Sequence, residues 1–349
     1  EFPWGPIKEF AAADLMGLYL PEEYGGFGGG TMEFCLAVEE ISRICGGVGV
    51  TFAASALGCV PILLFGSEEQ KKKYIPPIAK GDILAAFGLT EPEAGSDAGS
   101  TKTTAIKHGD HYVLNGKKHF ITNAGEAETY TVIAMTDKNK GSRGASAFIV
   151  EKGTPGFEFG KKEHKMGIRC SSTRELLFEN CKVPKENLLG KEGMGFIVAM
   201  KTLDRTRPGI AAQAVGIAQG ALDESIRYAK QRLQFGKPIL TLQAIQHMLA
   251  NMATEVEAAR ALTYAVARAI DRGEKNTSPP AAMAKLFASD VAMRVTTDAV
   301  QIFGGYGYMR EYPVEKMMRD AKITQIYEGT NQIQRNVIGL SLVKESARQ

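Results

Sequence analysis

The sequence predicts an α+β protein in three parts, helical, then β, then helical again. Apolar residues recur at spacings of three and four up to about residue 83 and again from residue 191, as they do in amphipathic helices. Between them, short β-branched and aromatic runs alternate with turns rich in Gly, Asp, Asn and Pro, which is typical of strands. We therefore expect an N-terminal helical domain over residues 1–83, a middle β domain over 84–190 and a C-terminal helical domain over 191–349.

The helical period is longest in the last part, over residues 195–232 and 242–270, and these stretches are long enough to form a bundle. Pro208 lies inside the first stretch. Because proline lacks the backbone donor and clashes with the preceding turn, we expect it to kink or end that helix. The double prolines that begin at Pro76 and Pro279 predict loops between helices.

Composition excludes several classes of protein. The formal charge is +3, from 42 basic and 39 acidic residues without a long run of one sign, so nothing indicates a nucleic-acid or anionic-membrane partner. Five scattered cysteines without CxxC spacing argue against a disulfide framework and a zinc site, and they favour a reducing compartment. We find no uncharged apolar stretch of about 18 residues and expect no transmembrane helix.

Several nucleotide-binding and hydrolase motifs are missing from the sequence. There is no GxxxxGK[ST] and no GxGxxG between a strand and a helix, which excludes a P-loop or a Rossmann fingerprint. No serine lies in GxSxG. His108 and His111 form the only close histidine pair, and because no further ligand completes a set, we expect no metal site.

One carboxylate stands out in QIYEGTNQIQ, residues 325–334, where Glu328 lies between an aromatic residue and a glycine. Poor solvation there would raise its pKa and suit it to act as a general base toward a weakly acidic C–H group. Gly329 would let a substrate approach the backbone closely. The alternative is a helix N-terminus that Thr330 or Asn331 caps, with Glu328 solvated beside it.

Two segments near the β domain are candidates for ligand contacts. LTEPEAGSD, residues 89–97, offers the hydroxyls of Thr90 and Ser96 and consecutive backbone amides, although an ordinary entry turn explains the same composition. FITNAG, residues 120–125, places an aromatic ring beside a hydroxyl at a strand end. The alternative for this isolated aromatic residue is a place in the core.

Two further segments lie in the last helical part. QRLQFGKPI, residues 231–239, contains Arg232, whose planar donors suit a phosphate or pyrophosphate, although a solvated cation at a helix end fits equally well. The glycine cluster of QIFGGYGY, residues 301–308, offers backbone amides to a ligand or serves as a helix C-cap.

Together, in this order and spacing, these five segments resemble the acyl-CoA dehydrogenase family, in particular its short- and medium-chain, butyryl-CoA dehydrogenase-like branch, from about Phe2 to Leu340. The resemblance implies a helical N-terminal domain, a middle β-barrel-like domain and a C-terminal four-helix bundle. It also implies FAD between the β domain and the bundle, and a homotetramer that completes each flavin site. A few tens of residues with the first helices, and any targeting peptide, are expected ahead of Glu1.

The resemblance also implies roles for individual residues. Glu328 takes the place of the catalytic glutamate in the family's YEGT motif, while Thr206 occupies the position that carries the base in another branch and cannot serve as one. The implied flavin contacts in the β domain are Phe87, Leu89, Thr90, Ser96, Phe120 (where many members have Trp), Ile121 and Thr122. Thr330 and Gln332 are implied as further FAD contacts. The neighbouring subunit is expected to contribute Arg232, Phe235, Gln243, Gln301, Gly304 and Gly305. The implied acyl-CoA contacts are Ser96, Asp204, Arg207, Tyr327 and Gly329.

The implied reaction is a step of fatty acid β-oxidation. Glu328 removes the α proton of a short or medium straight-chain acyl-CoA, the β hydrogen leaves as hydride to the flavin, and an electron-transfer flavoprotein takes the electrons. The Glu328 backbone amide and a flavin hydroxyl hydrogen-bond to the thioester oxygen. The alternatives are an enoyl-CoA reductase, an acyl-CoA oxidase (usually a longer chain), and a silent acyl-CoA- or flavin-binding subunit. The expected location is the cytoplasm of a bacterium or archaeon, or the mitochondrial matrix of a eukaryote.

Overall fold

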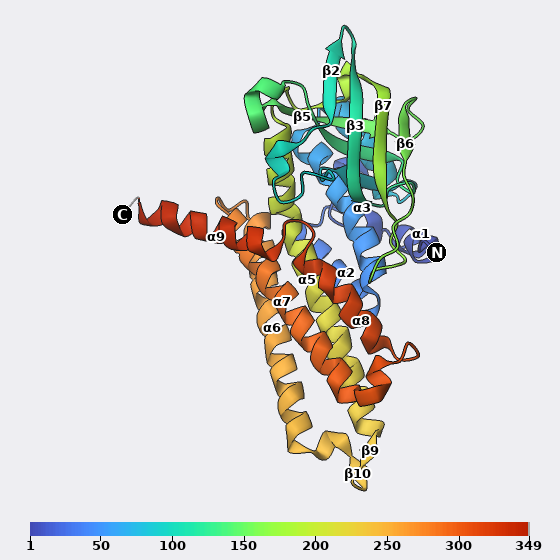
Figure 1. Cartoon of the computed structure of the whole chain (residues 1–349), viewed down its shortest axis with the longest axis vertical. Coiled ribbons are helices and arrows are strands. Elements are labelled where there is room, and N and C mark those ends of the chain that lie inside the picture. The colour runs from blue at the N-terminus through green and yellow to red at the C-terminus, as the bar shows by residue number, and fades with distance from the viewer. Residues whose placement is uncertain (348–349) are drawn as a thin grey trace. The chain divides into compact units, whose positions relative to one another are not determined.

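The computed structural model describes residues 1–347, which group into two compact units (Figure 1). Unit 1 comprises Glu1–Gly30, Thr51–His164 and Cys170–Thr206. Unit 2 comprises Thr31–Val50, Lys165–Arg169 and the chain from Arg207 onward. This division differs from the three domains expected from the sequence, whose boundaries at residues 83 and 190 stay a prediction.

Unit 1 is built on an eight-stranded sheet in the part of the chain that the structure describes. The strand order is β6-β7-β3-β2-β4-β5-β8, with β1 paired to β4. The pairs are antiparallel except β1–β4 and β2–β4. The strands are β1 (Ala85–Gly88), β2 (Thr104–His108), β3 (His111–Thr122), β4 (Thr129–Met135), β5 (Ala145–Glu151), β6 (Phe157–Phe159), β7 (Thr173–Pro184) and β8 (Leu188–Leu189).

Helices of unit 1 pack against this sheet, and apolar side chains from both form a buried core. α1 (Trp4–Ala12) and α4 (Glu68–Ala79) belong to unit 1, together with most of α3 (Gly46–Phe65). Cys59 and Ile62 of α3 lie in one buried cluster with apolar residues of β1, β4 and β5. α4 begins with a capping box, in which the Ser67 hydroxyl accepts from the Gln70 amide and the Gln70 side chain accepts from the Ser67 amide.

The expectation that no uncharged apolar stretch of membrane-spanning length exists was wrong, because α3 is one. Its 20 residues include no charged side chain, and it is long and apolar enough to cross a membrane by length and composition. In the structure, however, 72% of its most apolar window is buried inside the protein. A core helix that is packed on all sides is apolar all round, which is why the sequence test does not separate it from a membrane span.

Unit 2 is a helical bundle. Its helices are α2 (Thr31–Ile44), the second part of α5 (Gly195–Gln231), α6 (Gln243–Asp271), α7 (Ser278–Phe303), α8 (Pro313–Lys322) and α9 (Asn331–Ser346). Small and β-branched residues of α5, α6, α7 and α8 form its buried core. The Asp271 carboxylate, at the end of α6, accepts from the Thr31 and Met32 amides at 2.7 and 2.8 Å and so caps α2 from a distant part of the chain.

The α+β fold class predicted from the sequence is confirmed by the middle sheet and the helical bundle, but the prolines behave differently from expectation. α5 continues through Pro208, since buried residues on both sides keep the helix packed. Pro279 lies in the first turn of α7, where a missing backbone donor costs nothing. Pro76 lies inside α4. The predicted loops at Pro76 and Pro279 were therefore wrong. Of the two outcomes expected at Pro208, a helix end is excluded and a kink stays a prediction.

The burial of α3 leads to a stability prediction. Ile62 is fully buried, and replacing it by alanine should lower the free energy of unfolding by about 2–5 kcal/mol, because the lost apolar contacts leave a cavity. Leu64, two residues away, is 44% exposed and provides the control, so Leu64→Ala should cost much less. Urea denaturation followed by circular dichroism measures both. Equal losses in the two variants would contradict the assignment of α3 as a core helix.

Candidate functional site

The loop that carries Glu328 has an unusual backbone. It lies between a short 3-10 helix (Ile323–Gln325) and α9, and Glu328 has φ +50° and the following Gly329 φ +89°. The left-handed region is unfavourable for a residue with a Cβ and costs of order 1–3 kcal/mol, so it persists where the surroundings impose it. Such residues cluster at functional sites, and Glu328 is one of eight non-glycine residues with positive φ in the part of the chain that the structure describes.

The helix N-terminus considered as the alternative reading of this loop is present. Thr330 is the N-cap of α9, and its hydroxyl accepts from the Ile333 amide at 3.2 Å. Glu328 itself is half-buried. A capped helix start and a half-buried glutamate therefore occur together in this loop.

The carbonyls of the loop are held by two buried side chains. The Gln334 Nε2 donates to the Glu328 carbonyl at 3.1 Å and to the Gly329 carbonyl at 2.9 Å. The Lys285 Nζ donates to the Gly329 carbonyl at 2.7 Å and to the Asn331 Oδ1 at 3.0 Å. Gly329 has φ +89°, which favours glycine, and a Cβ there would lie 2.7 Å from the Gln334 Nε2, so that side chain would have to shift.

Lys285 was missed in the sequence. It lies on α7 with no exposed surface, and burial lowers its pKa from 10.5 to about 7. The nearby charge of Arg207 lowers this pKa further, while the negative charges of Glu328 and Asp290 raise it. The available signal was a single lysine amid the small apolar residues of AAMAKLFAS, residues 281–289. Its partners lie 44 and 46 residues away, so sequence alone could not identify them.

Tyr327 turns its phenol to the bundle. Its hydroxyl donates to the Gln213 Oε1, and the Gln213 Nε2 donates to the Gly46 carbonyl at 3.0 Å. Burial, with the Glu328 charge as a smaller cause, raises the pKa of Tyr327 far above its usual value, so the phenol stays neutral. These contacts fix the residue that precedes Glu328.

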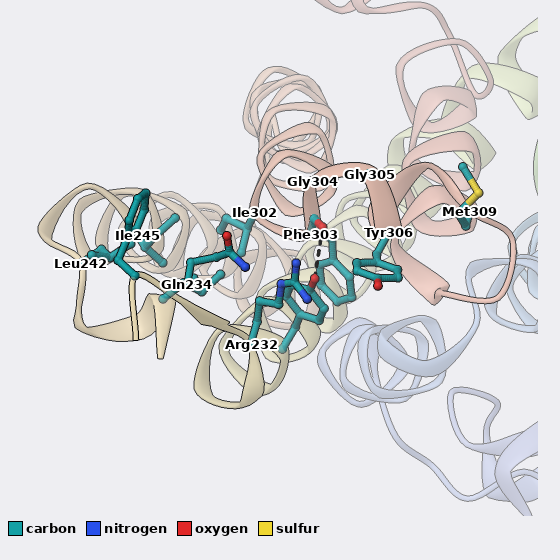
Figure 2. A pocket seen from close by; sticks show the side chains of 13 residues that line it. Arg232, Gln234, Leu242, Ile245, Ile302, Phe303, Gly304, Gly305, Tyr306 and Met309 are labelled. Atoms are coloured by element: carbon teal, nitrogen blue, oxygen red, sulfur yellow. Dashed lines mark hydrogen bonds between the residues drawn. The ribbon is translucent and has the colours of Figure 1, made fainter. Parts of the chain in front are cut away.

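Four of the six residues expected to serve a neighbouring flavin meet in one pocket at the end of the bundle (Figure 2). Arg232, Phe235, Gly304 and Gly305 line this cavity of about 650 Å³. The Arg232 guanidinium lies 5.3 Å from the centre of the Tyr306 ring. Other lining residues come from α5, α6 and α7, among them Tyr228, Ile245, Ile302 and Phe303.

The remaining two residues of that set do not line the pocket. Gln243 is the first residue of α6 and Gln301 lies in the last turn of α7, and both are exposed.

Phe235 lies in the turn between β9 (Leu233–Gln234) and β10 (Lys237–Pro238), has φ +53° and is 89% exposed. A strained and fully exposed aromatic residue of this kind is typical of a surface that binds a partner or ligand.

In unit 1 the structure brings the segment after β1 to the end of β3. Phe87 lies in β1, and Leu89 and Thr90 follow it directly. The Thr90 carbonyl accepts from the His119 amide at 2.8 Å. Ser96 is exposed further along the same loop.

Phe120 points out of the sheet. The β3–β7 register shifts between Lys118 and Ile121, Phe120 has φ +58°, and 60% of its surface is exposed. A β-bulge re-aims a side chain in this way, so the alternative that places Phe120 in the core is wrong. Ile121, in contrast, has a buried side chain and Thr122 is half-buried. Any ligand contact of Ile121 is therefore made by its backbone.

A buried ion pair that sequence reasoning also missed holds the loop after β1. The Lys118 Nζ donates to the Glu91 Oε1 at 2.7 Å and to the Leu89 carbonyl at 3.1 Å. Glu91 also accepts from the Lys102 and Thr103 amides at 2.6 and 3.0 Å. Burial lowers the pKa of Lys118 to about 8 against the pull of Glu91. The pair is fully hydrogen-bonded, which a buried charge requires.

The other predicted residues lie on α5 and α9. Asp204 is half-buried and Arg207 is buried, while Gln332 is exposed in the first turn of α9. The Thr206 hydroxyl donates to the Thr202 carbonyl at 3.1 Å within α5. Within residues 1–347 no group of three His, Cys, Asp or Glu side chains is arranged to hold a metal ion, and all five cysteines carry free thiols.

Three family models match the chain in order. They describe the N-terminal domain of acyl-CoA dehydrogenase at residues 1–82, the middle domain at 86–181 and the C-terminal domain at 193–343. The chain belongs to the acyl-CoA dehydrogenase family.

Three related proteins align with nearly the whole chain. An acyl-CoA dehydrogenase of Bacillus subtilis is 56% identical over 98% of this chain and 90% of its own length. A short-chain specific acyl-CoA dehydrogenase of Megasphaera elsdenii is 54% identical over 97% of this chain and 89% of its own. An acryloyl-CoA reductase (NADH) of Anaerotignum propionicum is 51% identical over 98% of this chain and 87% of its own.

Solved structures agree with the fold. Butyryl-CoA dehydrogenase from Megasphaera elsdenii has a TM-score of 0.96 at 53% identity and covers 98% of this chain and 90% of its own. A chain from the structure "Electron transferring flavoprotein of Acidaminococcus fermentans: Towards a mechanism of flavin-based electron bifurcation" has a TM-score of 0.97 at 57% identity, covering 98% and 90%. An acyl-CoA dehydrogenase complexed with FAD from Bacillus anthracis has a TM-score of 0.92 at 40% identity, covering 98% and 61%.

The buried pair in unit 1 predicts coupled stability effects. Lys118→Met should lower the free energy of unfolding by about 3–5 kcal/mol, because it leaves the Glu91 charge buried without its cation. Adding Glu91→Gln removes that charge and keeps one acceptor oxygen, for one of the two backbone amides that Glu91 binds through different oxygens, so the double variant should regain at least about 1 kcal/mol. Urea unfolding of the two single variants and the double variant measures the coupling. Strictly additive losses would contradict the pairing.

Lys285 predicts a pH dependence of stability. Its pKa is about 7 in the folded protein and ordinarily 10.5, so between these values the unfolded chain binds a proton that the folded chain has released. The free energy of unfolding of the wild type, relative to that of Lys285→Met, should therefore rise with pH across this window, by at most about 1.4 kcal/mol per pH unit. Urea titrations at pH 7, 8 and 9 test this, and parallel curves would contradict it.

Proposed function

We propose that this chain is an FAD-dependent dehydrogenase that converts a short- or medium-chain acyl-CoA to the trans-2-enoyl-CoA and passes the electrons to an electron-transfer flavoprotein. The observation that carries the proposal is the left-handed Glu328, held half-buried in a capped loop of a chain that belongs to the acyl-CoA dehydrogenase family. The names of its relatives, short-chain specific acyl-CoA dehydrogenase and butyryl-CoA dehydrogenase, favour short acyl chains.

The residues present fit FAD. The bundle-end pocket combines one cation, Arg232, with the exposed glycine backbone at Gly304 and Gly305, a donor set suited to a diphosphate and its adenosine. In unit 1 the outward ring of Phe120 and the loop at Leu89 and Thr90 offer an aromatic wall and backbone groups to the isoalloxazine ring. When bound, FAD would accept the hydride that leaves the β carbon of the acyl group. The relative from Bacillus anthracis contains FAD.

The spacing along α7 supports a flavin site that two subunits share. Lys285, which touches the Glu328 loop, and Gly304, which lines the pocket, are 19 residues apart in the chain. At 1.5 Å per helical residue this is about 28 Å, so the Glu328 loop and the pocket lie at opposite ends of the bundle. We propose that the pocket serves the flavin of a neighbouring subunit in a homotetramer.

In this proposal Glu328 is the catalytic base. Its carboxylate takes the α proton of the acyl-CoA thioester, and its backbone N–H donates to the thioester oxygen, where charge develops as that proton leaves. Ser96, Asp204, Arg207, Tyr327 and Gly329 contact the acyl-CoA. Exclusion of water by the acyl chain strengthens these interactions, since charges attract more strongly in a medium of low dielectric constant.

A second function is the reverse reaction. A relative 51% identical to this chain is named acryloyl-CoA reductase (NADH), and the same base can return a proton to the α carbon when the flavin is reduced. The ratio of butyryl-CoA oxidation to crotonyl-CoA reduction separates the two directions. A silent binding subunit is disfavoured by the presence of Glu328. The named relatives are bacterial, and we place the protein in the cytoplasm of a bacterium.

Replacing the base tests the proposal. Glu328→Gln removes the proton acceptor and keeps the size of the side chain, so kcat with butyryl-CoA should fall about 10²–10⁴-fold while FAD remains bound. Turnover with an artificial electron acceptor and the visible absorption of the purified protein measure both quantities. Glu158, exposed on β6, provides the control, and Glu158→Gln should keep wild-type turnover. Wild-type kcat in Glu328→Gln would contradict the assignment of the base.

A further inference from the structure

We propose that Lys285 is a positioning residue, which holds the Glu328–Gly329 backbone in its left-handed conformation by tying the Gly329 carbonyl and Asn331 to α7. The inference rests on the proposed role of Glu328 as the base. It adds a residue that does not touch the reacting atoms but sets the direction of the carboxylate that does.

The first observation is the set of contacts at the Lys285 Nζ. It donates to the Gly329 carbonyl at 2.7 Å and to the Asn331 Oδ1 at 3.0 Å, on the two sides of Thr330. Lys285 is therefore hydrogen-bonded to the residues on both sides of the N-cap Thr330, directly after Glu328. The side chain has no exposed surface, so no bulk water competes for these acceptors.

The second observation is the position in the chain of the two side chains, Gln334 and Lys285, that hydrogen-bond to the loop carbonyls. Gln334 also holds the loop, through the carbonyls of Glu328 and Gly329, but it lies on α9 only five and six residues further along the chain. Gln334 moves with the loop that it holds. Lys285 lies 44 residues away on α7, a long helix of the bundle core, so it fixes the loop against the rest of unit 2.

A buried polar network continues from Lys285 along α7 and fixes the acceptor that Lys285 uses. The Asn331 Nδ2 donates to the Ser289 Oγ at 2.9 Å and to the Asp290 Oδ1 at 2.7 Å. Asp290 also accepts from the Gln325 Nε2 at 2.6 Å, on the N-terminal side of the loop. Both ends of the Glu328 loop are thus bound to one face of α7.

The third observation is the strain in the loop. Glu328 adopts φ +50° although it carries a Cβ, and a conformation of this kind relaxes when its support is removed. Burying a lysine is itself unfavourable. An apolar residue at position 285 would avoid that cost and would lose the donor to Gly329, so the lysine is explained by the loop that it holds and not by packing.

The experiment compares three variants of the FAD-loaded full chain. Lys285→Met keeps the length of the side chain and removes the donor, while Lys285→Gln keeps a shorter, neutral donor. Lys275→Met, at an exposed lysine just before α7, is the matched control. Amide hydrogen exchange of peptides that cover residues 325–334 reports the loop, and peptides from α6 report the rest of unit 2.

Exchange of the 325–334 peptides should speed up at least about tenfold in Lys285→Met, less in Lys285→Gln, and not in Lys275→Met, with α6 unchanged. With butyryl-CoA, kcat should fall about 10–100-fold in Lys285→Met with a smaller change in KM, because a misplaced base acts on the transition state. Lys285→Gln should recover part of this loss.

Wild-type exchange in a folded Lys285→Met variant would overturn the proposal. Should that variant fail to fold, wild-type exchange in Lys285→Gln would overturn it instead. A wild-type protein that turns over no acyl-CoA would reject the proposed function, while the exchange comparison would still decide whether Lys285 holds the loop.

Discussion

The hydrogen bond from the buried Lys285 to the Gly329 carbonyl is the constraint on which the Glu328 loop depends. Three features meet there: a left-handed glutamate, a glycine with φ +89°, and the capped start of α9. Each is locally unfavourable or only weakly favourable, and none fixes the loop alone. The loop keeps its shape because α7 supplies a buried donor from outside the loop.

A buried lysine also hydrogen-bonds to a loop carbonyl in unit 1. Lys118, buried in β3, donates to the Leu89 carbonyl and to Glu91, and so fixes the segment after β1 to which we assign flavin contacts. In both places a buried lysine holds the backbone of a loop from a neighbouring rigid element. A lysine suits this task because its long side chain reaches across an interface and its three donors serve several acceptors at once.

The sequence was informative where the signal is local. The short β-branched and aromatic runs between residues 84 and 190 predicted strands, and β3 and β4 confirm two of them. The fold class followed from the same patterns. The prediction that Glu328 is the base came from a motif and not from periodicity, because one carboxylate in a loop has no periodic signature.

What could not be predicted depends on tertiary partners. Lys118 and Lys285 look like surface residues until Glu91 and the Gly329 carbonyl are placed beside them. Phe120 points outward because a register shift against β7 turns it, and a register shift in a partner strand leaves no mark on the sequence of β3. Pro208 continues a helix because its neighbours are packed, which overrides the local preference for a break.

The most direct test of the account is anaerobic mixing of the FAD-loaded wild-type protein with butyryl-CoA while the visible absorption of the flavin is recorded. The account predicts that the flavin band bleaches and that crotonyl-CoA appears in proportion. A band that keeps its oxidised intensity at saturating butyryl-CoA and at every other acyl chain length would contradict the assignment of this site to acyl-CoA dehydrogenation.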